Sequence, residues 1–150
     1  MQKKDNNELL SDKIEHLSKL LDEYKIEASQ DIRIDLTNFE NNFNRFDLVL
    51  KWLDKSIVWK KAVDSTRNIL SKVVSELNDK YISEALYNIS EKALKVKVEA
   101  NDKYQVYRKQ FFYTDLIQNY CVEIMNILKS QHFEIKNRFE YMRFINGLDK

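Results

Sequence analysis

Apolar residues recur near the start of the chain at alternating intervals of four and three positions. The members of this series are Leu10, Ile14, Leu17, Leu21, Tyr24 and Ala28. Heptad spacing of this kind places all of them on one side of an α-helix. Residues 6–28 are therefore predicted to form an amphipathic helix that packs against another helix.

A second helix is predicted over residues 37–81. The letters TNFE form a capping box, in which the Thr37 side chain accepts from the backbone N–H of Glu40. One apolar stripe follows: Phe39, Phe43, Phe46, Leu50, Leu53 and Ile57. Another lies on nearly the opposite side: Trp52, Trp59, Val63, Leu70, Val73 and Leu77. The apolar face changes sides near residues 57–59, so either the helix breaks there or one long helix packs against two partners, as helices of oligomers often do.

Two short segments alternate apolar and polar residues with period two. They are DIRIDLT at residues 31–37 and LKVKVEA at residues 94–100. This alternation is typical of strands, and it predicts that the two segments pair as a small ribbon.

Helical periodicity returns at Asn101, a candidate N-cap, and continues to residue 147. The first seam consists of Ile117, Cys121, Ile124 and Leu128, and the next of Ile135, Phe139 and Met142. Gly147 suits the left-handed position that closes a helix. Residues 101–147 are therefore predicted to be a C-terminal helical region.

Composition agrees with this all-α interpretation. The 150 residues include one glycine and no proline, and the turns of sheet proteins depend on both. A chain of this length fits one domain, residues 1–150, built as a bundle of long helices. There is one cysteine and no apolar run that resembles a signal peptide or a membrane span, so we expect a cytoplasmic protein without a membrane partner.

The sequence offers little for catalysis. His16 and His132 have no second histidine at metal-ligand spacing, and Cys121 lies on an apolar seam. A single glycine at position 147 excludes a glycine-rich phosphate loop. We therefore predict no catalytic residue, no metal, no cofactor and no enzymatic activity.

One segment is clearly basic. Residues 51–75 carry six basic and two acidic side chains, whereas residues 1–50 carry seven basic and eleven acidic ones. The basic residues are Lys51, Lys55, Lys60, Lys61, Arg67 and Lys72, and they interleave with Trp52 and Trp59. Cations beside aromatic rings are typical of single-stranded nucleic-acid sites. The alternative is a solvated helix face, with both tryptophans in the core.

The C-terminal stretch HFEIKNRFEYMRFING, residues 132–147, mixes aromatic and basic side chains densely. Helix packing would explain Phe133, Phe139 and Phe144, and a nucleic-acid surface would explain Arg138 and Arg143. The residues alone leave both interpretations open.

Three segments together resemble the UvsY family, the recombination mediators of T4-like bacteriophages. They are DIRIDLTNFENN, then LVLKWLDK with the basic helix and Tyr81 after it, and finally MNILKSQHFEIKNRFEYMRFING. Departures from the family pattern include Tyr81, which is followed by Ile82 rather than a second tyrosine and glycine, and the family's late basic residues, which align with Ser75 and Leu77. Lys60, Lys61, Arg67 and Lys72 could take over that role.

The resemblance implies a ring-shaped homo-oligomer of six or seven subunits that binds single-stranded DNA. It would help a phage RecA-like recombinase to displace the phage single-strand-binding protein, in the cytoplasm of the infected bacterium. The C-terminal aromatics would then lie between subunits, and the expected oligomerisation residues are Ile117, Ile124, Leu128, Phe133, Ile135, Phe139, Met142, Phe144 and Ile145. A helical protein–protein adaptor, acting through residues 6–28 without DNA, remains the alternative function.

Overall fold

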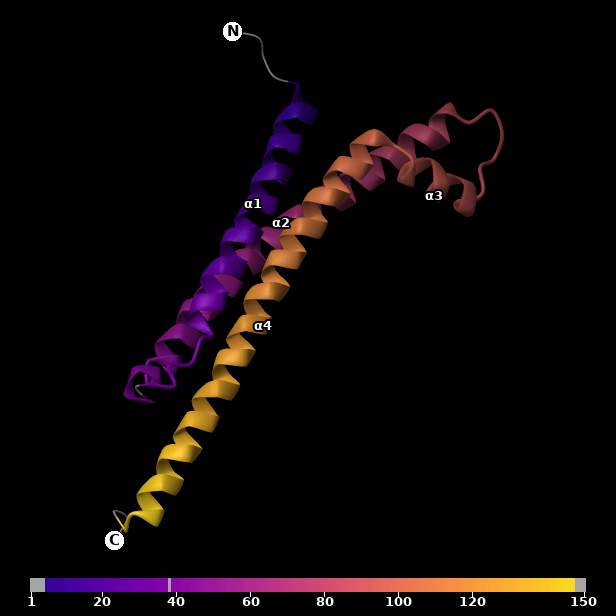
Figure 1. The fold of residues 1–150 in the computed structure, drawn as a ribbon. Coiled ribbons are helices and arrows are strands. Elements are labelled where there is room, and N and C mark those ends of the chain that lie inside the picture. The colour runs from indigo at the N-terminus through magenta and orange to yellow at the C-terminus, as the bar shows by residue number, and fades with distance from the viewer. Residues whose placement is uncertain (1–4, 38, 148–150) are drawn as a thin grey trace. The chain divides into compact units, whose positions relative to one another are not determined.

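A computed structural model describes residues 5–37 and 39–147, with Asn7, Phe39 and Glu40 by their backbone alone. These residues form four α-helices and one 3₁₀ turn and contain no strand, which confirms the all-α prediction (Figure 1). The elements are α1 (Asn6–Asp31), η1 (Phe39–Asn42), α2 (Arg45–Glu84), α3 (Glu91–Glu99) and α4 (Asp102–Ile145). None of the described helices carries an apolar stretch that could cross a lipid bilayer.

The contacts divide the chain into two compact units. Unit 1 comprises Met1–Asp22 and Trp59–Ile117, and unit 2 comprises Glu23–Val58 and Gln118–Lys150. Helices α1, α2 and α4 each contribute one segment to each unit. Helix α2 continues without a break through residues 57–59, so the change of apolar face does not mark a helix end.

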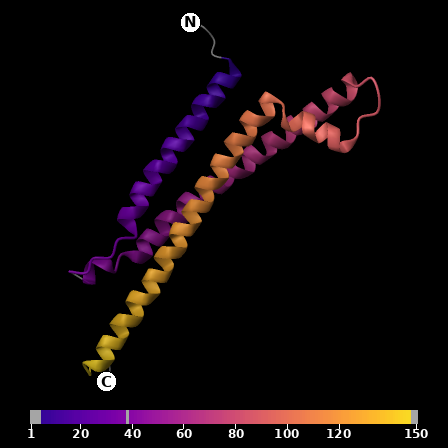
Figure 2. The ribbon, with the colours of Figure 1, turned by 45° about the vertical axis from the view of Figure 1, so that its right-hand side comes forward.

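Unit 1 is held by apolar contacts between α2, α3 and α4. Val73 and Leu77 of α2 pack with Val98 of α3. Partly buried side chains surround them: Val74, Tyr81, Leu94, Tyr104 and Tyr107. In both views α3 folds back beside the end of α2 (Figure 2).

Unit 2 has a core centred on Trp52. Its indole is 0% exposed and meets Tyr24 of α1 and Tyr120 of α4 edge-on, with ring centroids 5.8 and 6.4 Å away. The other buried apolar side chains of this unit are Ala28, Val49, Cys121, Ile124, Leu128 and Ile135. Trp52 is therefore a core residue, as the second interpretation of the sequence held.

The segment predicted to start the second helix forms a turn instead. Asp35 accepts from the backbone N–H and the hydroxyl of Thr37, at 2.8 and 2.7 Å. Asn42, which is buried, accepts from the Asp35 N–H and donates to the Asp35 carbonyl, at 2.7 and 2.9 Å. These side chains satisfy the backbone locally, so α2 begins at Arg45 rather than at Thr37. The side chains of Phe39 and Glu40, named in the prediction, lie outside the described part.

The predicted ribbon is wrong, because residues 91–99 form helix α3. Ser90 caps this helix, and its hydroxyl accepts from the backbone N–H of Ala93 at 3.2 Å. Leu94 and Val98 are four residues apart and face the unit 1 core, whereas Val96 is exposed. The alternating residues Leu94, Val96 and Val98 thus include a pair, Leu94 and Val98, that is also spaced for one face of a helix. The N-cap at Ser90 favours the helix over the strand.

The predicted ends of the last helix are confirmed. The side-chain oxygen of Asn101 accepts from the backbone N–H of Lys103 at 2.9 Å and from that of Tyr104 at 3.4 Å. Gly147 has a φ of 67° and follows the last turn of α4.

Candidate nucleic-acid interface

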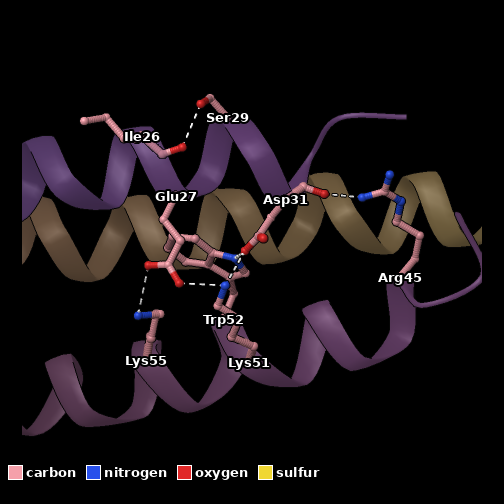
Figure 3. Close-up of polar contacts among 8 residues, drawn as sticks. All are labelled: Ile26, Glu27, Ser29, Asp31, Arg45, Lys51, Trp52 and Lys55. Atoms are coloured by element: carbon pink, nitrogen blue, oxygen red, sulfur yellow. Dashed lines mark hydrogen bonds and ion pairs between the residues drawn. The ribbon is translucent and has the colours of Figure 1, made fainter. Parts of the chain in front are cut away.

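Two of the six predicted DNA-contacting cations are paired with carboxylates of α1 in unit 2. Lys51 Nζ lies 2.6 Å from Glu27 and 2.7 Å from Asp31, and Lys55 Nζ lies 3.3 Å from Glu27 (Figure 3). Lys55 also stands over the Tyr24 ring, 4.3 Å from its centroid. These two lysines join α1 to α2, so their charge is already compensated within the unit.

The pKa shifts of this group agree with the pairing. Burial would lower the pKa of Lys51, but hydrogen bonds to Asp31 and Glu27 outweigh it and raise that pKa. Burial would raise the pKa of Glu27, but hydrogen bonds from Lys51 and Lys55 outweigh it and lower that pKa. Both shifts favour the charged forms, which keeps this bridge ionised at neutral pH.

Asp31 and Arg45 fix the place where α1 ends and α2 begins. Asp31 accepts from the indole Nε1 of Trp52 at 2.8 Å, besides its bond with Lys51 (Figure 3). The buried guanidinium of Arg45 donates to the backbone carbonyls of Asp31 and Arg33. Neither Glu27 nor Asp31 stood out in the sequence, because each is one of many acidic residues in the first fifty positions.

The other four predicted cations lie on the unit 1 part of α2, and all four are exposed. Lys60 and Arg67 are seven residues apart and Lys61 and Lys72 eleven, so each pair shares one side of the helix to within about 20°. From Lys60 to Lys72 the charges extend along roughly 18 Å of helix axis. Within the described residues, no carboxylate pairs with Lys60, Lys61 or Lys72.

Arg67 has two neighbours that leave it accessible. Its Nη1 lies 3.4 Å from Asp64 in an exposed pair, a kind of pair worth about 0–1 kcal/mol. Its guanidinium also lies 5.7 Å from the ring centroid of Phe111 on α4. Phe111 carried no signal in the sequence, since only the fold brings it beside α2.

Unit 2 exposes large apolar side chains on two helices. On and just before α2 they include Phe43, in the turn that precedes the helix, and Phe46, Leu50 and Ile57 of the helix itself; all four belong to the first apolar stripe of the sequence. On α4 they include Phe133, Phe139, Met142, Phe144 and Ile145. Phe43 meets Phe139 edge-on, with ring centroids 5.6 Å apart, so the two exposed sets join. A groove of about 210 Å³, lined in part by these two rings and Ile135, lies beside them.

The predicted oligomerisation residues separate into two groups. Ile117, Ile124, Leu128 and Ile135 are buried by their own chain and act as core residues of their units. Phe133, Phe139, Met142, Phe144 and Ile145 remain exposed, with Phe139 42% and Phe144 73% accessible. Of the predicted set, the second group is accessible at the surface of its unit.

The described residues hold no group of three or more His, Cys, Asp and Glu side chains that could bind a metal ion. Cys121 is fully buried, and burial raises the pKa of its thiol to about 11. A thiol in this state is protonated at neutral pH and is a poor nucleophile.

Comparisons with known proteins bear on the fold and the family of the chain. The fold matches a crystal structure of the bacteriophage T4 recombination mediator protein UvsY with a TM-score of 0.70, over 83% of this chain and 97% of that chain, at 22% sequence identity. The chain is also 27% identical over 151 residues to the CRISPR-associated endoribonuclease Cas13a of Leptotrichia shahii, but spans only 10% of that protein's length. The family model described as "Recombination, repair and ssDNA binding protein UvsY" matches residues 27–148. Because the family model matches 122 of the 150 residues and the helical fold is shared, the chain belongs to the UvsY family of recombination, repair and single-stranded-DNA-binding proteins.

Proposed function

We propose that this protein is a recombination mediator with no catalytic step of its own. It binds single-stranded DNA and helps a RecA-like recombinase to replace the single-strand-binding protein on the strand, in the cytoplasm of an infected bacterium. Bending or wrapping the strand weakens the competing protein–DNA complex and presents the strand to the recombinase. The work is done by binding free energy alone.

The contrast among the predicted cations carries the proposal. Lys51 and Lys55 are neutralised by Glu27 and Asp31, whereas Lys60, Lys61 and Lys72 are exposed and have no carboxylate partner within the described chain. Charges without a partner can neutralise phosphates and release the counterions bound to them. We therefore assign the DNA contacts to Lys60, Lys61, Arg67 and Lys72, and not to Lys51 and Lys55.

A ring of six or seven subunits would make such a small site effective. Four cations bind one strand weakly, but a second subunit that engages the same strand does so at high effective concentration. The exposed apolar side chains of unit 2 favour association, since patches of this kind on a single chain usually mark an interface. The proposed interface comprises Phe133, Phe139, Met142, Phe144 and Ile145 of α4, Phe46 and Leu50 of α2, and Phe43 in the turn before α2.

The adaptor hypothesis receives less support, because most of the heptad seam on which it depends is buried. Leu10, Ile14, Leu21 and Ala28 of α1 are all buried inside their own units. Most of the heptad seam of α1 thus packs within the chain itself, which favours the mediator over the adaptor, while Leu9 and Ile26 of α1 are exposed.

Fluorescence anisotropy of a labelled dT oligomer across a salt series tests the DNA site. Four phosphates neutralised per subunit give a log–log slope of about −2.8 per subunit, at about −0.7 for each phosphate of a single strand. Lys60→Gln with Lys61→Gln removes two of these contacts, so we expect weaker binding and a slope of about −1.4 per subunit. The oligomer mass should not change.

Lys92→Gln with Lys95→Gln on α3 is the matched control, because it removes the same charge from exposed positions of the same unit. This control should keep the wild-type slope. Equal losses in both double variants would show that only net charge matters and would remove the assignment to α2. No binding of the wild-type protein at low salt would overturn the proposed function itself.

A further inference from the structure

Helix α4 carries a basic and aromatic surface that none of the predicted DNA contacts includes. Phe112 is 58% exposed, and Arg108 and Lys109 are exposed beside it. Arg108 precedes Phe112 by four residues and Lys109 by three, so all three side chains share one side of α4. We call these three residues the α4 platform.

The platform borders a groove of unit 1. The groove has a volume of about 500 Å³, and its walls include Ser11 and Ile14 of α1 as well as the three platform residues. This volume is within the usual range of ligand sites, roughly 300–1,000 Å³. The Phe112 ring is supported from one side by Tyr113, which it meets edge-on with centroids 5.7 Å apart.

The charges of the platform are available to a ligand. Within the described residues, neither Arg108 nor Lys109 forms an ion pair. An exposed ring beside two cations that form no ion pair is complementary to a ligand that has both flat rings and negative charges.

Single-stranded DNA fits this description better than another protein does. Each nucleotide supplies a base that can stack on a ring and a phosphate that can lie between cations. A second copy of this surface would bring like charges together. An apolar partner would remove water from both cations without giving them a counter-charge. Neither a second copy nor an apolar partner therefore explains why two cations stand beside the ring.

We propose that Phe112 is a base-stacking platform for single-stranded DNA, with Arg108 and Lys109 neutralising the flanking phosphates. This inference rests on the proposed function and adds to it a contact with the bases. The cations of α2 contact only the phosphates of the DNA, so they would bind any polyanion with accessible phosphates. A stacking residue instead requires unpaired bases, and it gives the protein a means to prefer single strands over duplexes.

The test compares a dT oligomer with an abasic oligomer of equal length, which keeps every phosphate and lacks every base. The wild-type protein should bind dT more tightly than the abasic strand. Phe112→Ala should weaken dT binding about tenfold, the contribution of a single stacked base, and leave abasic binding and the salt slope unchanged. Phe112→Trp should restore the preference, and its fluorescence should be quenched by dT.

Tyr87→Ala is the control, because Tyr87 is an exposed aromatic of the same unit, at the α2–α3 connection. It should behave as wild type. An unchanged dT preference in Phe112→Ala, with normal salt-dependent binding, would overturn the platform and leave the proposed function in place. Equal weakening on both oligomers would also overturn it, as would a change of oligomer mass without a change of affinity. No binding of either oligomer by the wild-type protein would overturn both proposals.

Discussion

Replacing Trp52 by phenylalanine tests whether this ring belongs to the core or to the DNA site. The substitution removes the hydrogen bond from Nε1 to Asp31, which is 2.8 Å long and ends on a charged acceptor. Bonds of this type contribute about 1.5–3 kcal/mol, and the lower value applies because Lys51 still donates to the same oxygen. The smaller ring also leaves a void in a site that is 0% exposed, at about 1 kcal/mol. We therefore expect the free energy of unfolding to fall by about 2–3 kcal/mol.

Urea unfolding followed by circular dichroism, at one fixed protein concentration, measures this change. Trp59→Phe makes the same chemical change at a half-buried position of the same helix, and it should cost less. DNA affinity of Trp52→Phe, measured where the variant is folded, should equal that of wild type. Wild-type stability combined with a loss of DNA affinity would refute the reasoning, because it would mean that bases reach this ring.

Two further perturbations address the interface and the charges. Phe139→Asp places a carboxylate on the exposed apolar surface of unit 2. Light scattering should then show a smaller assembly, and circular dichroism an unchanged helicity. Glu134→Asp, a change at an exposed residue of the same helix, should keep the mass of the assembly. If Phe139→Asp assembles normally, this surface is not between subunits. The pKa of Glu27 is lower in the folded chain than its ordinary value of 4.5, so its contribution to stability is complete above pH 4.5 and is lost as the pH falls through the folded value. Glu27→Gln should therefore flatten the acid side of a stability–pH profile, and an unchanged profile would contradict the pairing with Lys51 and Lys55.

Much of the helical framework could be predicted from the sequence, because its signals are local or periodic. Leu10, Ile14 and Leu21 follow a heptad and are buried, Asn101 caps α4, and Gly147 adopts the left-handed conformation. Patterns of this kind depend on the geometry of the helix backbone alone, so the structure shows them where the sequence predicts them.

The errors arose where one pattern fits two structures. Leu94, Val96 and Val98 satisfy both a strand and a helix, and the cap at Ser90 selects the helix. The second helix was predicted to begin at TNFE, but Asp35 binds Thr37 within a turn and α2 begins at Arg45.

The site was predictable only in part, because pairing is a property of the fold. Lys51 and Lys60 look alike in the sequence, and only the approach of α1 shows that Lys51 is neutralised by Glu27 and Asp31. Phe112 carried no signal of its own, since exposed and buried phenylalanines obey the same helical spacing. The uneven distribution of charge along the sequence identifies a basic helix. Which of its cations are left without a carboxylate partner, and so can bind DNA, depends on the residues that the fold places beside them.

The rate at which the buried thiol of Cys121 is alkylated can report how often the helices around it separate. The side chain is fully enclosed by unit 2, and its pKa of about 11 keeps it protonated and unreactive at neutral pH. Alkylation of Cys121 then requires a transient opening of the surrounding helices, and under slow-labelling conditions its rate measures the population of that opened state. As the chain contains one cysteine, the signal comes from a single position and needs no engineered label. Events that tighten or loosen the helices around Trp52 become visible as a change in labelling rate.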